Sequence, residues 1–177
     1  MSHGNLKRAL VLALVLTGSL TACGGSSNKT SATATPEVTA GPGDSGACKP
    51  IGTGTTDLTK KPVFTVSKDP APTTTTIMDI VCGTGAEAVD GSKVTVKYAG
   101  VNYADGKEFD SSWSRGDSET LGFSIGSGVI AGFSKGTSGM KVGGRREVIV
   151  TPADGYGNGG PVPGGTLVFF IDLVSVS

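Results

Sequence analysis

Histidine is nearly absent from this chain of 177 residues: His3 is the only one, and it lies in the N-terminal segment considered below. The rest of the chain therefore has no imidazole for a catalytic triad, a histidine-ligated metal site or a proton shuttle. Net charge is also lacking, because 15 lysines and arginines balance 15 aspartates and glutamates, and no basic cluster occurs. This pattern gives no electrostatic basis for binding nucleic acid, and we expect no such partner.

The N-terminal apolar run, Ala9–Leu16, is too short to span a bilayer. With Lys7 and Arg8 before it, the run is typical of a secretory signal. It leads into Leu-Thr-Ala-Cys at 20–23, which resembles the lipobox of bacterial lipoproteins, where the chain is cut before a cysteine that becomes lipidated. We predict a lipoprotein signal peptide at 1–22, lipidation of Cys23, and export to the extracytoplasmic face of the bacterial envelope. An ordinary signal peptide with a chance cysteine is the alternative.

Aromatic side chains are scarce in residues 23–61, where Ser, Thr, Gly, Ala and Pro predominate. Such a segment cannot bury enough apolar area to offset its ordering entropy, so it predicts a tether. Residues 62–177 are long enough for one domain with a core of its own. The remaining cysteines, Cys48 and Cys82, form an even pair in an exported protein, so a disulfide between them is expected, with two free thiols as the alternative.

Long helical periodicity is missing from the glycine-rich domain, and alternating patterns predict strands instead. In 93–100, Val94, Val96 and Tyr98 share one face. Further strands are expected at 62–66, 76–82, 121–125, 146–152 and 166–176. The single helix expected, at about 131–140, contains three glycines and must be held by packing. The pattern predicts an α+β domain, an antiparallel sheet with one short helix on its concave face.

The stretch Gly-Ser-Gly-Val-Ile-Ala-Gly-Phe, residues 126–133, joins a predicted strand to that helix. Gly126 and Gly128 permit a sharp turn, which leaves Val129, Ile130 and Phe133 to line a hollow. The glycine spacing is also similar to nucleotide-binding loops, but no βαβ unit surrounds it and no Gly-Lys-Ser/Thr follows, so that interpretation is rejected.

Five motifs, in order along the chain, carry a more specific resemblance. They are VKYAGVNYADGKEFDSSWSRG, IGSGVIAGF, GMKVGGRREVIV, DGYG and GGTLVFFIDL. Together they resemble the FK506-binding (FKBP) type of peptidyl-prolyl isomerase over about 73–177. The resemblance implies an antiparallel sheet of five to six strands wrapped around one short helix, with an apolar pocket between the helix and the sheet.

The resemblance also implies the residues of the site. The catalytic positions are Tyr98, Asp110 and Tyr156. Substrate-binding positions are Phe109, Arg115, Leu121, Phe123, Val129, Ile130, Phe133, Val162 and Phe169. Three departures from the family pattern occur. Phe133 stands where a tryptophan is frequent, the loop from Tyr156 to Pro163 is short and lacks a histidine found in some members, and the third is Trp113. Trp113 is an additional aromatic near the rim, consistent either with a substrate contact or with packing on its own loop.

Aromatic residues at alternating strand positions are usually core residues, which is the alternative to a pocket. The Phe109–Asp110 pair favours the pocket, because an acidic group beside inward aromatics is costly unless it has a partner, such as Arg115 or Tyr98. The resemblance implies an isomerase that needs no metal or cofactor and assists the folding of exported proteins. Its substrates would be proline-containing polypeptides, and macrolides of the FK506 or rapamycin type would compete for the same pocket. The protein would be a monomer. The alternative is a membrane-tethered module that binds proline peptides with little turnover.

Overall fold

The computed structural model describes residues 48–177 except 53, 64 and 66, and all of them lie in the second of two units of the chain, Val38–Ser177. The predicted signal peptide, Cys23 and most of the predicted tether lie outside the described residues. None of the described helices is long and apolar enough to cross a membrane. In chain order the elements are β1 (Thr76–Val81), β2 (Lys93–Asn102), β3 (Glu108–Ser111), β4 (Leu121–Ser124), α1 (Ala131–Thr137), β5 (Arg145–Val150) and β6 (Leu167–Val176).

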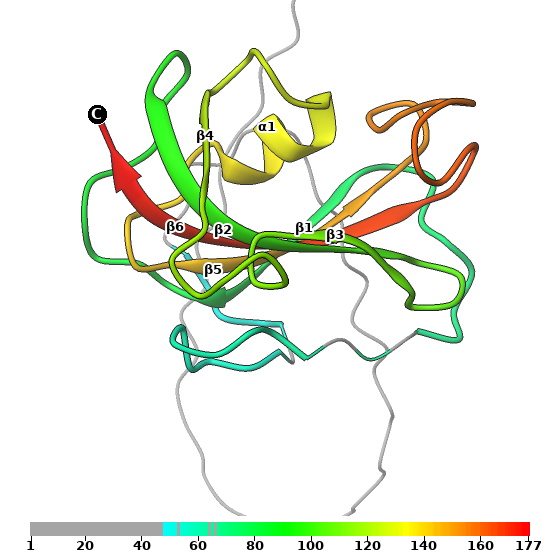
Figure 1. Cartoon of the computed structure of the whole chain (residues 1–177), viewed down its shortest axis with the longest axis horizontal. Coiled ribbons are helices and arrows are strands. Elements are labelled where there is room, and N and C mark those ends of the chain that lie inside the picture. Colours follow the sequence, from blue (N-terminus) through cyan, green and yellow to red (C-terminus); the bar gives the residue numbers. More distant parts are fainter. Residues whose placement is uncertain (1–47, 53, 64, 66) are drawn as a thin grey trace, which may run out of the picture. The chain divides into compact units, whose positions relative to one another are not determined.

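The strands form one antiparallel sheet in the order β1-β5-β6-β2-β3, and β4 also pairs with β2. The longest ladder joins β2 to β6, from Val94 opposite Val176 to Asn102 opposite Leu167. The first half of β2 pairs with β4 and its second half with β3. Figure 1 shows the sheet curving around α1, so the predicted α+β fold, with a sheet of six strands and one short helix, is confirmed.

Two strand predictions were wrong in opposite ways. The described residues of 62–66 form no strand, and Val63 is 71% exposed, while Phe64 and Val66 lie outside the described residues. β3 was missed, because its sequence Glu-Phe-Asp-Ser has two acidic residues and no β-branched residue to indicate a strand. β3 exists because it pairs with the second half of β2, a tertiary contact that its own sequence does not reveal.

The helix α1 packs on β5 through glycines. A Cβ atom at Gly132 would lie 2.3 Å from Val150 Cγ1, and one at Gly136 would lie 2.4 Å from Val148 Cγ2. The helix is shorter than predicted: it ends at Thr137, because Ser138 leaves the helical conformation and Gly139 takes a φ of +75°. The larger core lies between this helix and the side of the sheet that carries Val148 and Val150, which we call the helix face.

The opposite side, which we call the outer face, carries a smaller apolar cluster that includes Ile80, Val101, Tyr103 and Val168. The described residues of 48–63, which we call the arm, lie against this face, across the sheet from α1 (Figure 1). The backbone N–H groups of Ile51 and Gly52 both donate to Asp79 O. The C-terminal part of the predicted tether is therefore docked on the domain, and the docked chain begins earlier than the expected boundary at residue 62.

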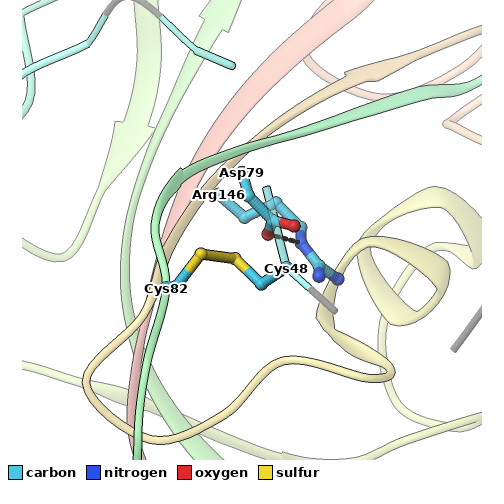
Figure 2. The surroundings of a disulfide bond; sticks show 4 residues. All are labelled: Cys48, Asp79, Cys82 and Arg146. Carbon is cyan, nitrogen blue, oxygen red and sulfur yellow. Dashed lines mark hydrogen bonds and ion pairs between the residues drawn. A yellow bond between two sulfur atoms is a disulfide. The ribbon is translucent and has the colours of Figure 1, made fainter. Parts of the chain in front are cut away.

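The arm is tied covalently as well, since Cys48 and Cys82 form the predicted disulfide, with their Cα atoms 5.7 Å apart. The bond lies beside an ion pair between Arg146 and Asp79, 2.7 Å apart (Figure 2). Arg146 also donates to the carbonyls of Gly136 and Ser138 at the end of α1. The start of the arm and the end of the helix are thus held at one corner of the sheet.

Arg145 holds the rest of the arm. Its side chain is fully buried and makes two bonds to Asp172, at 2.5 and 2.7 Å. The same guanidinium donates to Thr55 O at 2.6 Å and Lys60 O at 3.0 Å. A buried guanidinium needs partners for its donors, and here the arm's backbone provides those that Asp172 leaves free.

Replacing both Cys48 and Cys82 by serine is expected to lower the free energy of unfolding. The chain-entropy account gives about 3–4 kcal/mol for a closed loop of this length, and the two cysteines are 34 residues apart in sequence. Urea denaturation of the oxidised wild type and of the double variant measures the difference. Unchanged midpoints would show that the arm's hydrogen bonds, and not the disulfide, hold it in place.

Candidate active site

An open pocket lies between the start of α1 and the helix face of the sheet, with a volume of about 530 Å³. Its walls come from β2, β3, β4 and β6, from the turn before α1, and from the loop after β5. The lining residues are Tyr98, Asp110, Leu121, Gly128, Val129, Ile130, Phe133, Tyr156 and Phe169. The fold thus brings together eight of the twelve residues predicted for the site, from segments far apart in the sequence.

Phe133 forms the base of the pocket and is 3% exposed. Its ring meets three others edge to face, with centroid distances of 5.6 Å to Tyr98, 5.5 Å to Phe123 and 5.1 Å to Phe169. Such pairs each stabilise by about 0.5–1.5 kcal/mol beyond the area they bury. The base of the pocket is therefore a rigid aromatic surface, whose ring orientations are fixed by mutual contacts.

Phe109, Phe123, Val162 and Arg115 were predicted for the site but do not line the pocket. The first three are partly buried and pack against the core behind it. Phe109 meets Phe169 edge to face at 5.7 Å. Gly100 on β2 makes room for this pair, since a Cβ there would lie 2.8 Å from Phe109 Cζ and 2.9 Å from Phe169 Cε1. Phe109 and Phe123 therefore do not line the pocket, but pack against Phe169 and Phe133, which do.

Arg115 acts on the pocket through Asp110. Its guanidinium forms an ion pair with Asp110 and donates to the Tyr98 hydroxyl at 3.2 Å, while that hydroxyl donates to Asp110. Partial burial acts to raise the pKa of Asp110, but the hydrogen bonds from Tyr98 and Arg115 outweigh it and hold that pKa below the usual value. Burial, and then the bond to Asp110, raise the pKa of Tyr98. At neutral pH the cluster is an ionised carboxylate held by a neutral phenol and a guanidinium.

Two hydrogen-bond donors at the pocket have no partner among the described residues. One is the backbone N–H of Ile130, which precedes the first turn of α1. The other is the hydroxyl of Tyr156, whose pKa is raised by burial and by the charge of Asp110, so that it stays protonated at neutral pH. Both residues line the pocket. The pocket can therefore hold an apolar group against Phe133 and donate hydrogen bonds to oxygen atoms on that group.

Gly128 lines the pocket although it was not predicted as a site residue. The signal that could have found it is the Gly-Ser-Gly spacing predicted to form a sharp turn: Gly128 takes a φ of +82° there, and the turn brings the next two residues to the wall. Trp113 lies elsewhere: it is 9% exposed, with Lys97 Nζ 4.0 Å from the centre of its ring, and it does not line the pocket. Among the described residues, no group of three or more His, Cys, Asp or Glu side chains is arranged to hold a metal ion.

Comparisons with known proteins agree on one family. Residues 85–174 match the family described as FKBP-type peptidyl-prolyl cis-trans isomerase. A Corynebacterium glutamicum protein named "Probable FK506-binding protein" is 48% identical over 119 residues, covering 66% of this chain and 98% of that protein. An FK506-binding protein of Streptomyces anulatus is 47% identical over 111 residues, which cover 59% of this chain and 88% of that protein. The crystal structure of AtFKBP13 superposes with a TM-score of 0.53 at 32% identity, covering 60% of this chain and 96% of that one.

Proposed function

This chain belongs to the FKBP-type peptidyl-prolyl cis-trans isomerases, and we propose that it performs their reaction by holding a twisted prolyl amide in the pocket based on Phe133. The family acts on proline-containing peptides and binds FK506-type ligands. The observation that carries the mechanism is the pairing of a rigid aromatic base with two donors that have no partner among the described residues, the Ile130 N–H and the Tyr156 hydroxyl.

The reaction is a rotation about one bond. Its barrier is about 18–20 kcal/mol, because resonance gives the planar amide partial double-bond character. No covalent bond is made or broken, so the enzyme needs only to bind the twisted amide more tightly than either planar isomer. Each ~1.4 kcal/mol of that preference gives a tenfold increase in rate. A twisted amide has lost its resonance and is less polar, so an apolar aromatic environment favours it over both planar forms.

Different side chains bind different parts of the substrate. The prolyl ring packs among Phe133, Tyr98 and Phe169. The Ile130 N–H and the Tyr156 hydroxyl donate to carbonyl oxygens of the substrate, which fixes the backbone on either side of the rotating bond. Asp110 orients the Tyr98 ring through its hydrogen bond, and Arg115 holds the Asp110 carboxylate in place through an ion pair.

Replacing Tyr156 by phenylalanine keeps the ring and removes one donor. We expect kcat/KM for a prolyl tetrapeptide to fall about two- to tenfold, the loss of one neutral hydrogen bond. Asp110→Asn is expected to lower kcat without unfolding the protein. A protease-coupled isomerisation assay measures both variants. The matched control is Tyr103→Phe, which removes a hydroxyl that bonds to Asp69 O away from the pocket and should leave kcat/KM unchanged. Equal activity in Tyr156→Phe and wild type would remove Tyr156 from the mechanism.

The proposed chemistry involves no proton transfer, so activity should not depend on pH near neutrality. Asp110 has a lowered pKa and stays ionised until the pH falls below its usual titration range, while the raised pKa values of Tyr98 and Tyr156 keep both phenols protonated until the pH rises above theirs. Between about pH 5.5 and about pH 8.5, kcat/KM should vary by less than about twofold. Isomerisation followed by NMR line-shape analysis avoids the pH dependence of a coupling protease. A bell-shaped profile centred in this range would contradict the mechanism.

We propose further that the enzyme is an exported lipoprotein that assists the folding of exported proteins as a monomer. The apolar run followed by Leu-Thr-Ala-Cys supports lipidation at Cys23. The disulfide between Cys48 and Cys82 supports an oxidising compartment, since structural disulfides are rare in the cytosol. The remaining part of the segment after Cys23 would separate the domain from the membrane surface.

Cys23→Ser is expected to release the protein from the membrane fraction of its cell, because the lipid anchor is lost while the folded domain is unchanged. Fractionation followed by immunoblotting, with a high-salt wash, measures the distribution. The double variant Cys48→Ser, Cys82→Ser serves as the control, since it removes both cysteines outside the lipobox without leaving a free thiol and should leave the protein on the membrane. A Cys23→Ser protein that stays bound after the wash would contradict the lipoprotein assignment.

A further inference from the structure

Asp154 ties the loop after β5 to α1 and to the chain before β1, where the Thr151 N–H also donates to the Thr75 hydroxyl, at 3.4 Å. One carboxylate oxygen accepts a hydrogen bond from Lys135 Nζ on α1 at 2.7 Å. The other accepts from the hydroxyl of Thr75 at 2.7 Å. The backbone carbonyl of Asp154 accepts from the Gly132 N–H at 2.8 Å. Three groups from two other parts of the chain thus meet at one residue, which lies two positions before Tyr156.

The bond to Gly132 fixes the beginning of the helix. The first N–H groups of a helix have no partner within it, and α1 has no side-chain cap at Ile130. The Asp154 carbonyl provides the partner for one of these groups. Ile130 lies immediately before this turn, and its own carbonyl accepts from the N–H groups of Phe133 and Ser134. The position of Ile130 relative to the loop is therefore set through Asp154.

The loop itself is short and closed on the Tyr156 side. The Asp154 N–H donates to Thr151 O, and the N–H groups of Gly155 and Gly157 both donate to Pro152 O. Tyr156 is held between these bonds. The residue is 41% exposed, and its side chain lies against the backbone of Gly160 in the same loop, where a Cβ would lie 2.6 Å from Tyr156 Cγ. The direction of its hydroxyl therefore depends on where this turn lies relative to α1.

We propose that Asp154 is a positioning residue for catalysis: it sets the separation between the Tyr156 hydroxyl and the Ile130 N–H, the two donors that hold the substrate's carbonyl oxygens. This inference rests on the proposed function of those two donors. A carboxylate suits the task because each of its oxygens takes a different partner, one on α1 and one before β1. Hydrogen bonds from Lys135 and then Thr75 lower the pKa of Asp154, so the link is intact at neutral pH.

The test is a double-variant cycle in the full exported chain, with kcat/KM for a prolyl tetrapeptide measured for wild type, Asp154→Ala, Tyr156→Phe and the combination. Because Asp154 acts through Tyr156, Asp154→Ala should lower kcat/KM by at least about twofold and by no more than Tyr156→Phe does, within the two- to tenfold span of one hydrogen bond. In the Tyr156→Phe background, Asp154→Ala should have little further effect. Asp154→Asn, which keeps one acceptor oxygen, should restore part of the activity, and Thr75→Val should resemble Asp154→Ala in weaker form.

The control is Glu87→Ala, which removes a more exposed carboxylate that is also paired with a lysine, Lys141, at 4.0 Å and away from the pocket. It should leave kcat/KM unchanged, and circular dichroism should show that Glu87→Ala and Asp154→Ala are both folded at the assay temperature. Wild-type activity in Asp154→Ala, or losses that multiply in the double variant, would overturn the inference while leaving the isomerase mechanism intact. Full activity in Tyr156→Phe would overturn both the role of Tyr156 and this inference. An inactive wild type would instead contradict the proposed function itself.

Discussion

The close contact between α1 and β5 is the constraint on which the pocket depends. A helix of seven residues with two internal glycines has little stability of its own. It is held because Gly132 and Gly136 allow its backbone to approach Val150 and Val148 more closely than any side chain would permit. That approach places Phe133 at the centre of three other rings and leaves the open volume beside it. A side chain at either glycine would separate the helix from the sheet and break the contacts between Phe133 and the rings around it.

Two adjacent arginines on β5 hold neighbouring segments against the two faces of the sheet. Arg146 lies on the helix face, where it bonds to Asp79 and to the last carbonyls of α1. Arg145 lies on the outer face, where it bonds to Asp172 and to the backbone of the arm. Each buried charge has a carboxylate partner and further acceptors, as a buried charge requires. One strand therefore fixes the helix that forms the pocket and the segment that covers the opposite face.

Residues that alternate along β2 and β6 could be predicted from the sequence, because burial on one or both faces leaves a direct pattern of apolar side chains. The turn at Gly126 and Gly128 was enough to place Val129, Ile130 and Phe133 at a hollow. Tyr156 and Asp110 could be assigned only through resemblance, since nothing in their local pattern indicates that they converge. The arm was predicted to be part of a tether because its composition is that of a disordered segment. Its docking depends on Arg145, and nothing in the sequence indicates a fully buried arginine there, because arginine is seldom fully buried. Phe109 was assigned to the site through the same resemblance, and its packing on Phe169 depends on the space at Gly100, which the local sequence does not reveal.

The strand order carries a consequence for how the chain acquires its structure. Among the strands of the described residues, β1 comes first in sequence and pairs with β5 alone, and β5 in turn lies beside the last of them, β6. A chain that leaves a ribosome or a translocation channel from its N-terminus must hold β1 unpaired until nearly the whole domain has emerged. Pairings between distant segments are slow to form, because loop-closure entropy is lost before contacts compensate for it. This isomerase therefore has a topology that delays its own folding, because its sheet is complete only once β6 can pair with β5 and β2.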